Sequence, residues 1–488
     1  MEKINKLDSP FAIIMYHLFE IGIYLTIVLL TITILSSTIT QLNKNYFDLL
    51  NASELVGDKL PIISDSSLKI ELIFQKEIKR EGGTLSPVSS IAFLDANDIL
   101  ILNKNEGIVN RIVNGVLLEE PLLDVNVANK RERGMLGIAT TGSTTSNNDK
   151  NGHVRYVFLY YTESEKRDGS DICRATYYCK SDTETIGNQL YRYELKDNKL
   201  INQKLLLHLP AWPAPAHNGG IIKIGPDNNL YVTVGDFVGS VNETSRTKAQ
   251  NYKNGTEPDG RAGILRLTQE GKPLSEPILG KELPLNLYYA YGIRNSFGID
   301  FDPITHKLWD TENGPDYGDE INLVEPGFNS GWHKVQGIWK PKYDPERGGD
   351  LIAGEESLNP DRKDLVDFNG KGKYSAPEFT WNQTVGPTQI KFLHSDKYPK
   401  EYKDDLFVGD TNNGYLYHFD LNKDRKALTL NGTLEDKVAD NHNELGQIVF
   451  GEGFGQITDI EVGPDGYLYI LSHYKNMAKI FKITSAKI

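Results

Sequence analysis

Hydrophobic and polar residues alternate in short runs along most of this chain, which is the period expected of β-strands. Runs such as "RYVFLYYTES" (155–164) are rich in the aromatic and β-branched residues that favour strands. A turn containing Gly, Pro or Asp precedes many of these runs. The unit recurs in "LDANDILILNKNEG" (94–107), "GPDNNLYVTVGD" (225–236), "DPITHKLWDTENG" (302–314), "KDDLFVGDTNNG" (403–414) and "GPDGYLYILSH" (463–473). The pattern predicts an all-β domain.

The repeated turn–strand unit spans the whole domain, at irregular spacings that are mostly near multiples of a blade-sized unit. Repetition on this scale favours a β-propeller, whereas a β-sandwich with similar hairpins is the alternative. A propeller gathers the ends of its strands around a central axis. We therefore expect functional residues at the ends of the repeated strands.

The N-terminal part has a different pattern. Residues 21–40, "IGIYLTIVLLTITILSSTIT", carry no charge, and a stretch of 20 uncharged residues is long enough to span a bilayer as a helix. The sequence "LSSTIT" is a weak signal-peptide cleavage site, which favours an uncleaved anchor or signal. The predicted organisation is an anchor over 1–44, a linker over 45–67 and a propeller over 68–486.

Composition and modification motifs indicate the compartment. The net charge of −13, with no cluster of Lys and Arg, argues against nucleic acid as a partner. Cys173 and Cys179 lie close together in "DICRATYYCK", where a local disulfide suits an oxidising compartment and two separate thiols are the alternative. Glycosylation sequons occur at Asn51, Asn242, Asn254, Asn382 and Asn431. We expect a membrane-anchored protein whose propeller lies on the outer, extracytoplasmic side.

One turn carries a candidate general base. His217 stands in "PAPAHNGG", and Asp236 ends the strand that follows. The glycines after His217 let a ligand approach the backbone closely. A carboxylate bonded to one ring nitrogen fixes the tautomer and raises the basicity of the other nitrogen. The alternative is a structural or surface histidine.

Two further segments carry polar groups beyond the needs of turns. "YAYGIRNSFGIDFDP" (289–303) presents Arg294 and Asn295, which suit an anionic or carbonyl-rich ligand, although an arginine that locks a loop would look the same. "TENGPDYGDEINLVEPGFNSGWHKVQG" (311–337) is dense in acids, Asn and Gly, and these oxygen ligands suit Ca²⁺. The spacing of an EF-hand is absent, and a loop of solvated acids is the alternative.

The order of these motifs resembles that of the soluble quinoprotein glucose/sorbosone dehydrogenases, also called aldose sugar dehydrogenases. The resemblance begins near "SPVSSIAFLDANDILILNKNEGIVNRI" and "ERGMLGIA" and continues to "GPDGYLYILSH", so it covers roughly residues 68–486. It implies a six-bladed propeller. The predicted fold class is therefore all-β, a six-bladed β-propeller preceded by one N-terminal transmembrane helix.

The resemblance also implies a chemistry. Family members bind pyrroloquinoline quinone (PQQ) with Ca²⁺, oxidise the anomeric carbon of an aldose to a lactone by hydride transfer to the quinone, and pass electrons to an external acceptor. The implied roles are a general base (His217), a carboxylate that orients it (Asp236), quinone contacts (Arg294, Asn295), carbonyl ligands of the cofactor Ca²⁺ (Gly314, Pro315) and a second calcium site (Glu320, Ser330).

One region departs from the family pattern. Asn412, Asn413, Tyr415 and His418 stand where family members carry basic residues that neutralise the PQQ carboxylates, and Lys391 is the candidate substitute. This departure motivates an alternative function, a non-catalytic extracellular propeller that binds glycan or protein. A third hypothesis is a Ca²⁺-dependent hydrolase such as a lactonase, which requires carboxylate ligands on the axis.

Overall fold

The computed structural model describes residues 59–78, 87–141, 154–165, 185–212, 214–237, 246–345, 350–361 and 363–486. The chain divides into two compact units, Met1–Lys59 and Leu60–Ile488, and every described strand belongs to the second. The predicted anchor over 21–40 and the two cysteines, Cys173 and Cys179, lie outside the described residues.

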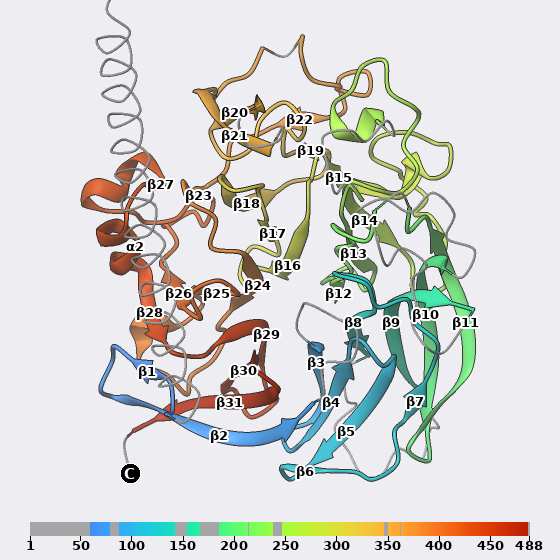
Figure 1. The fold of residues 1–488 in the computed structure, drawn as a ribbon, viewed down its shortest axis with the longest axis vertical. Helices are drawn as coiled ribbons and strands as arrows, with labels where there is room; N and C mark the ends of the chain where they lie inside the picture. Colours follow the sequence, from blue (N-terminus) through green and yellow to red (C-terminus); the bar gives the residue numbers. More distant parts are fainter. Residues whose placement is uncertain are drawn as a thin grey trace, which may run out of the picture. The chain divides into compact units, whose positions relative to one another are not determined.

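Nearly all regular structure in the second unit is β-sheet (Figure 1). The first sheet holds β3 (Val88–Asp95), β4 (Asp98–Asn103), β5 (Ile108–Val113), β6 (Val116–Leu117) and β7 (Leu123–Asp124). The second holds β8 (Met135–Thr140), β9 (Arg155–Ser164), β10 (Thr185–Lys196) and β11 (Lys199–Leu209). The third holds β12 (Ile222–Ile224), β13 (Leu230–Val234), β14 (Gly263–Leu267), β15 (Tyr288–Tyr291), β19 (Phe328–Asn329) and β22 (Lys373–Tyr374).

The remaining sheets come from the second half of the chain. The fourth holds β16 (Ser296–Phe301), β17 (Leu308–Glu312), β18 (Asp319–Val324), β23 (Phe379–Trp381) and β27 (Val438–Ala439). The fifth holds β24 (Pro387–Phe392), β25 (Leu406–Asp410), β26 (Leu416–Phe419), β28 (Val449–Glu452) and β1 (Ile62–Ile63). The sixth holds β29 (Gln456–Val462), β30 (Leu468–Tyr474), β31 (Met477–Ser485) and β2 (Leu68–Glu77), and β20 (Trp339–Asp344) pairs only with β21 (Asp350–Glu356). A short helix, α2 (His442–Ile448), precedes β28.

The first strands of successive sheets form a closed ring. β3 contacts β8, β8 contacts β12, β12 contacts β16, β16 contacts β24, β24 contacts β29, and β29 contacts β3 again. The two ends of the domain share the last sheet, because β2 pairs antiparallel with β31, with Leu68 opposite Ser485. This arrangement is a β-propeller, in which each sheet faces its neighbours and the ring is closed by strands from both ends of the chain.

Two copies of the repeated turn have the same geometry, which explains the sequence pattern. In "GPDNN" the Gly225 amide donates to the Asn229 carbonyl at 2.8 Å, and in "GPDGY" the Gly463 amide donates to the Tyr467 carbonyl at 2.8 Å. A tyrosine in the following strand, Tyr231 or Tyr469, then donates its hydroxyl to the aspartate of its own turn at 3.0 Å. The Gly-Pro-Asp signal therefore fixes both the turn and the start of the strand.

The hydrophobic core lies between neighbouring sheets, as the ring requires. All five residues of β13 are buried, because this strand is covered on both faces. The largest fully buried side chains include Trp309 on β17 and Trp381 on β23, which belong to one cluster between the fourth and fifth sheets. Burial of this apolar surface stabilises the ring by roughly 25 cal/mol per Å².

The predicted fold class, a six-bladed propeller preceded by one transmembrane helix, is wrong in that form. The described strands make seven sheets of two to six strands rather than a set of like blades. The cause is a set of short strands from distant segments: β19 and β22 extend the third sheet, and β27 extends the fourth, all in parallel pairing. No helix within the described ranges is long and apolar enough to cross a membrane. An apolar run of the right length allows a span but does not establish one.

Candidate functional site

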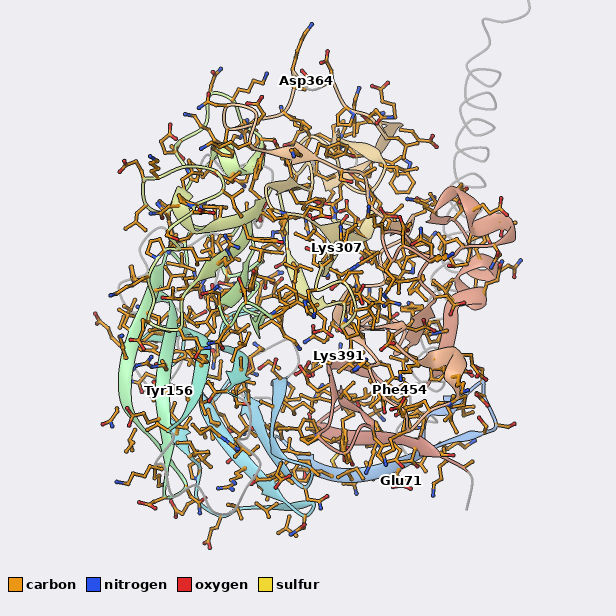
Figure 2. The ribbon with its side chains drawn as sticks, turned by 180° about the vertical axis from the view of Figure 1, so that it is seen from behind. Glu71, Tyr156, Lys307, Asp364, Lys391 and Phe454 are labelled. Atoms are coloured by element: carbon orange, nitrogen blue, oxygen red, sulfur yellow. The ribbon has the colours of Figure 1, made fainter. Side chains whose placement is uncertain are left out.

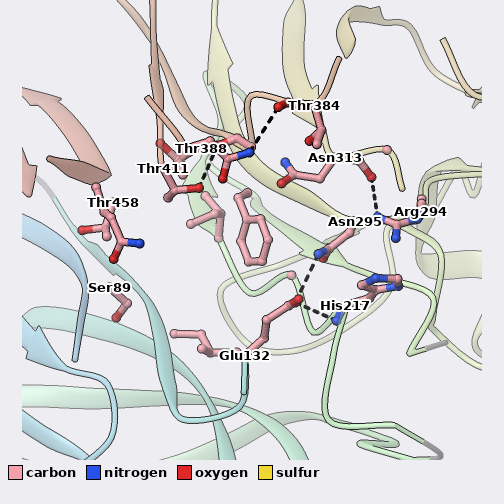
Figure 3. Close-up of a pocket in the computed structure, with 18 of the residues that line it drawn as sticks. Ser89, Glu132, His217, Arg294, Asn295, Asn313, Thr384, Thr388, Thr411 and Thr458 are labelled. Carbon is pink, nitrogen blue, oxygen red and sulfur yellow. Dashed lines mark hydrogen bonds between the residues drawn. The ribbon is translucent and has the colours of Figure 1, made fainter. Parts of the chain in front are cut away.

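A pocket of about 390 Å³ opens among the loops at one end of the ring (Figure 3). Five of the predicted site residues line it: His217, Arg294, Asn295, Gly314 and Pro315. They come from the loops between β11 and β12, between β15 and β16, and between β17 and β18. These loops lie at the same end of the ring because neighbouring strands in each sheet are antiparallel. Motifs that are separate in the sequence thus line one cavity.

His217 and Asp236 form the predicted pair. The His217 Nδ1 atom lies 2.6 Å from Asp236 Oδ1, and the Asp236 side chain is fully buried. The second carboxylate oxygen accepts a hydrogen bond from Trp332 Nε1 at 2.6 Å. The carboxylate is therefore fixed from two sides, and it fixes the tautomer of His217 with Nε2 as the remaining ring nitrogen.

The backbone of His217 is held in an uncommon conformation. Its φ is 58°, in the left-handed region that non-glycine residues seldom occupy. Its amide donates to Glu132 Oε2 at 2.6 Å. A Cβ atom at Gly235 would lie 2.1 Å from the His217 carbonyl oxygen, so only glycine fits at that position. These contacts place the imidazole at the pocket rather than leaving it in a free turn.

Arg294 and Asn295 are brought beside this pair. Arg294 donates from its guanidinium to the Asn313 carbonyl at 2.8 Å, and the guanidinium carbon lies 5.5 Å from the centre of the Trp332 ring. Asn295 Nδ2 donates to the same Glu132 oxygen at 3.1 Å, as Figure 3 shows. Arg294 Nε and Asn295 Oδ1 are buried and have no hydrogen-bond partner among the described residues. Two polar atoms are thus available to a ligand.

Gly314 and Pro315 are positioned by a buried carboxylate. Asp319 at the start of β18 accepts from the Gly314 amide at 2.8 Å through Oδ1. Its other oxygen accepts from Thr384 Oγ1 at 2.8 Å and from the amides of Val385 and Gly386 at 2.7 and 2.9 Å. Within the described part of the chain, no hydrogen bond reaches the carbonyl of Gly314 or of Pro315. Free carbonyl oxygens of this kind suit Ca²⁺.

Glu320 and Ser330 also come together, but behind the pocket rather than in its lining. Ser330 donates from Oγ to Glu320 Oε2 at 3.0 Å and also contacts Glu312 Oε2 at 2.6 Å. Burial raises the pKa of Glu312 to about 7, and burial together with the Glu312 charge raises the pKa of Glu320 well above its usual range. The second calcium site at Glu320 and Ser330 stays a prediction.

Lys391, which is labelled in Figure 2, is not among the residues that line the pocket. It is buried on β24, where its Nζ atom bonds Glu461 and lies 3.7 Å from Asp300 Oδ2. Lys223 joins the same network at 3.2 Å from Asp300 and 3.3 Å from Glu461. The ammonium group of Lys391 is therefore occupied by internal ion pairs, and its predicted contact with the cofactor finds no support in this geometry.

Three residues of the site escaped the sequence reasoning: Glu132, Trp332 and Lys104. Lys104 lines the pocket and donates from Nζ to the carbonyls of Arg131 and Arg133, each at 2.9 Å. Burial lowers its pKa to about 7, which the nearby Glu132 charge partly opposes. Glu132 is the first residue of "ERGMLGIA", a motif on which the family resemblance rests. That motif is the feature of the sequence that could have identified Glu132 as a site residue.

The turn beside the pocket supplies a pH-dependent prediction. Asp410, at the end of β25, accepts from the Gly414 amide at 2.7 Å and from the Tyr417 hydroxyl at 2.6 Å. Burial raises its pKa to about 6. The folded pKa thus exceeds the unfolded pKa of about 3.9, so stability from this group is present at low pH and is lost as pH rises through about 6.

We expect Asp410→Asn to gain stability relative to the wild type by about 2 kcal/mol between pH 4 and pH 7, because the substitution removes the buried charge. Urea unfolding at both pH values measures the difference. Asp424→Asn, at an exposed position, is the matched control and should show no such trend. Parallel pH curves for Asp410→Asn and the wild type would contradict the assignment of a costly buried charge.

Comparison with known proteins identifies the family. The family model for glucose/sorbosone dehydrogenase matches residues 85–482, which is more than half of the chain. The chain belongs to the glucose/sorbosone dehydrogenase family. This confirms the resemblance seen in the sequence.

Three relatives of this glucose/sorbosone dehydrogenase family member have low sequence identity to it. Aldose sugar dehydrogenase YliI of Escherichia coli (strain K12) is 28% identical over 269 residues, which are 54% of this chain and 59% of that protein. The soluble aldose sugar dehydrogenase from Escherichia coli has a TM-score of 0.58 at 21% identity, over 86% of this chain and 99% of that one. The PQQ-bound aldose sugar dehydrogenase from Streptomyces coelicolor has a TM-score of 0.53 at 18% identity, over 87% and 99%. These structures share the fold.

Proposed function

We propose that this protein oxidises an aldose or a related sugar at the anomeric carbon to the lactone, in a reaction that depends on PQQ and Ca²⁺ and delivers hydride to the quinone. The observation that carries the proposal is the His217–Asp236 pair at a pocket that also contains Arg294 and Asn295. Family membership supports sugar oxidation, and the PQQ-bound relative supports the cofactor. An external electron acceptor would complete the cycle.

The pocket has groups that fit one side of the cofactor. Arg294 Nε and Asn295 Oδ1 are buried without a partner among the described residues, and a quinone with its ring nitrogens offers both acceptors and donors. The carbonyls of Gly314 and Pro315 would hold Ca²⁺. When bound, PQQ supplies the two-electron acceptor that no amino-acid side chain provides.

The residues of the chain would manage the proton. Asp236 holds Nδ1 of His217, so Nε2 would accept the proton of the anomeric hydroxyl. The carboxylate then stabilises the imidazolium, and Trp332 keeps that carboxylate in place at 2.6 Å. Glu132 fixes the backbone of His217, so the base stays at one position while substrate binds.

The test is a calorimetric and optical titration of the full chain with PQQ in the presence of Ca²⁺, followed by addition of an aldose and an artificial electron acceptor. We expect one-to-one binding, bleaching of the quinone by the sugar, and reduction of the acceptor. Absence of binding at micromolar PQQ would reject the quinoprotein function. The extracytoplasmic location stays a prediction. Of the three glycosylation sequons whose asparagine lies in the described part of the chain, Asn254 and Asn431 are exposed and Asn382 is half-buried.

A second candidate function is a binding propeller for glycans without redox chemistry. It is favoured by the neutral polar residues in the lining, Thr384, Thr388, Thr411, Asn412 and Thr458. It predicts saccharide binding with no change in the quinone spectrum, so the same titration distinguishes the two functions.

A further inference from the structure

Three side chains of the kinds that bind metal ions gather in the fifth sheet, at the end away from the pocket. Asp405 directly precedes β25, His418 lies on β26, and Asp420 directly follows β26 (Figure 1). The other end of β25 leads into Thr411 and Asn412, which line the pocket. A strand of this length spans about 17 Å, so the group is separate from the site of the proposed reaction.

The pairing of the two strands puts these side chains on one face of the sheet. Phe407 on β25 is paired with His418 on β26, and paired residues of neighbouring strands share a face. Residues two positions apart along a strand also share a face, which places Asp405 on the side of Phe407 and Asp420 on the side of His418. The register therefore brings two carboxylates to one imidazole.

The distances between the ligand atoms suit a single metal ion. His418 Nε2 lies 3.0 Å from Asp405 Oδ2 and 3.5 Å from Asp420 Oδ1, and one ligand atom from each residue lies within 4.8 Å of the other two. Zinc bonds of about 2.0–2.2 Å at tetrahedral angles hold neighbouring ligand atoms about 3.3 Å apart. The three side chains thus need little movement to share one Zn²⁺ ion.

The imidazole of His418 is held in place by aromatic packing. Its ring centre lies 4.9 Å from that of Phe407, 5.2 Å from that of Tyr402 and 5.9 Å from that of Phe450. Nε2 meanwhile faces the two acids. A ligand whose orientation is fixed by packing needs little reorganisation when a metal binds.

The two carboxylates have no lysine or arginine as a counter-ion. Within the described part of the chain, neither Asp405 nor Asp420 forms an ion pair with such a residue. Lys403, two positions before Asp405, bonds Asp396 instead at 2.5 Å. Asp405 is buried, and a buried carboxylate is costly unless an opposite charge lies close to it. A divalent cation would supply that charge, whereas the alternative is an imidazolium of His418 that bridges the two acids alone.

We propose that Asp405, His418 and Asp420 bind a divalent transition-metal ion, most readily Zn²⁺. An imidazole with two carboxylates is a ligand set that suits zinc, whereas calcium takes oxygen ligands. The side chain of Asp420 is 58% exposed, which gives the ion an entry path and leaves room for water as a fourth ligand. The ion would tie the start of β25 to the end of β26, and the inference does not depend on the proposed sugar oxidation.

The experiment is a calorimetric titration of the full chain with ZnCl₂ in the presence of excess CaCl₂, which occupies sites built from oxygen ligands. We expect the wild type to bind one equivalent of Zn²⁺ more than His418→Asn. Asp420→Asn should weaken that binding by about tenfold or more, since even the loss of an outer partner of a metal ligand costs that much. Zn²⁺ should also raise the melting temperature of the wild type more than that of His418→Asn.

His394→Asn is the matched control. His394 bonds Asp404 at the surface, and no third ligand joins that pair among the residues that the structure describes. This variant should keep the zinc stoichiometry and affinity of the wild type.

Two results would overturn the site. Equal zinc binding by the wild type, His418→Asn and Asp420→Asn would show that the imidazole only pairs with the acids. Displacement of the bound Zn²⁺ by the excess Ca²⁺ would show that no imidazole takes part in binding. Asp420→Asn decides the question if the loss of His418 disturbs folding, because the side chain of Asp420 is exposed.

Discussion

Replacing His217 should reduce the rate of sugar oxidation by about two to four orders of magnitude, the contribution typical of a positioned general base. The imidazole bonds Asp236 at 2.6 Å, and among the described residues His217 is the only histidine that lines the pocket. Asn is the substitution to use, because Asn tolerates the left-handed φ of 58° better than Ala. Dye-coupled turnover at saturating PQQ and Ca²⁺ measures the effect.

The control for His217→Asn is another histidine bonded to an aspartate. His394 lies at the surface and bonds Asp404, so His394→Asn removes an equivalent pair away from the pocket and should leave turnover unchanged. Thermal unfolding and PQQ affinity of His217→Asn should stay close to those of the wild type. Turnover of His217→Asn within a few fold of the wild type would show that another group removes the proton.

Asp236→Asn separates orientation from proton transfer. The amide can still accept from Trp332, but it cannot stabilise the imidazolium of His217 as a carboxylate does. An amide whose oxygen faces Trp332 turns its Nδ2 donor toward Nδ1 of His217, which leaves the ring proton on Nε2, the wrong tautomer for a base. We therefore expect a loss of turnover comparable to that of His217→Asn, measured in the same dye-coupled assay.

The order of motifs along the chain is enough to predict a propeller and to pick out the loops that meet at the pocket. The Gly-Pro-Asp turns are local signals, and Gly225 and Gly463 form the same turn in both copies. His217 and Asp236 were predictable as a pair because a single hairpin of β12 and β13 separates them. Such short-range relations survive in a sequence read without coordinates.

Long-range relations were not predictable in this way. Trp332 reaches Asp236 from 96 positions away, and Glu132 reaches His217 from 85 positions away. Lys391 was assigned to the cofactor on charge alone, whereas the fold turns its ammonium group toward Glu461 and Asp300. Sheet sizes depend on the same kind of distant pairing, as with the added strands of the third and fourth sheets. Periodicity carries no information on which distant segments meet.

The buried carboxylate of Asp319 is a position where a substitution should lower the stability of the fold strongly. Its two oxygens accept four hydrogen bonds, from the amides of Gly314, Val385 and Gly386 and from the Thr384 hydroxyl. Removing the carboxylate leaves these donors without their acceptor in a buried site, where each unsatisfied group costs about 1–3 kcal/mol. The loss of a buried charge offsets part of that cost, since burial raises the pKa of Asp319.

We therefore expect Asp319→Ala to lower the free energy of unfolding by about 3 kcal/mol or more, measured by urea denaturation. Asp316→Ala, three positions earlier and exposed, is the matched control and should change stability little. A loss below about 0.5 kcal/mol for Asp319→Ala would mean that the surrounding loops reorganise around the missing acceptor. Because Asp319 joins the loop of Gly314 to the loop of Thr384, the same substitution should weaken binding on both sides of the pocket. Calcium affinity, measured by calorimetry on the folded variant, should then fall as well.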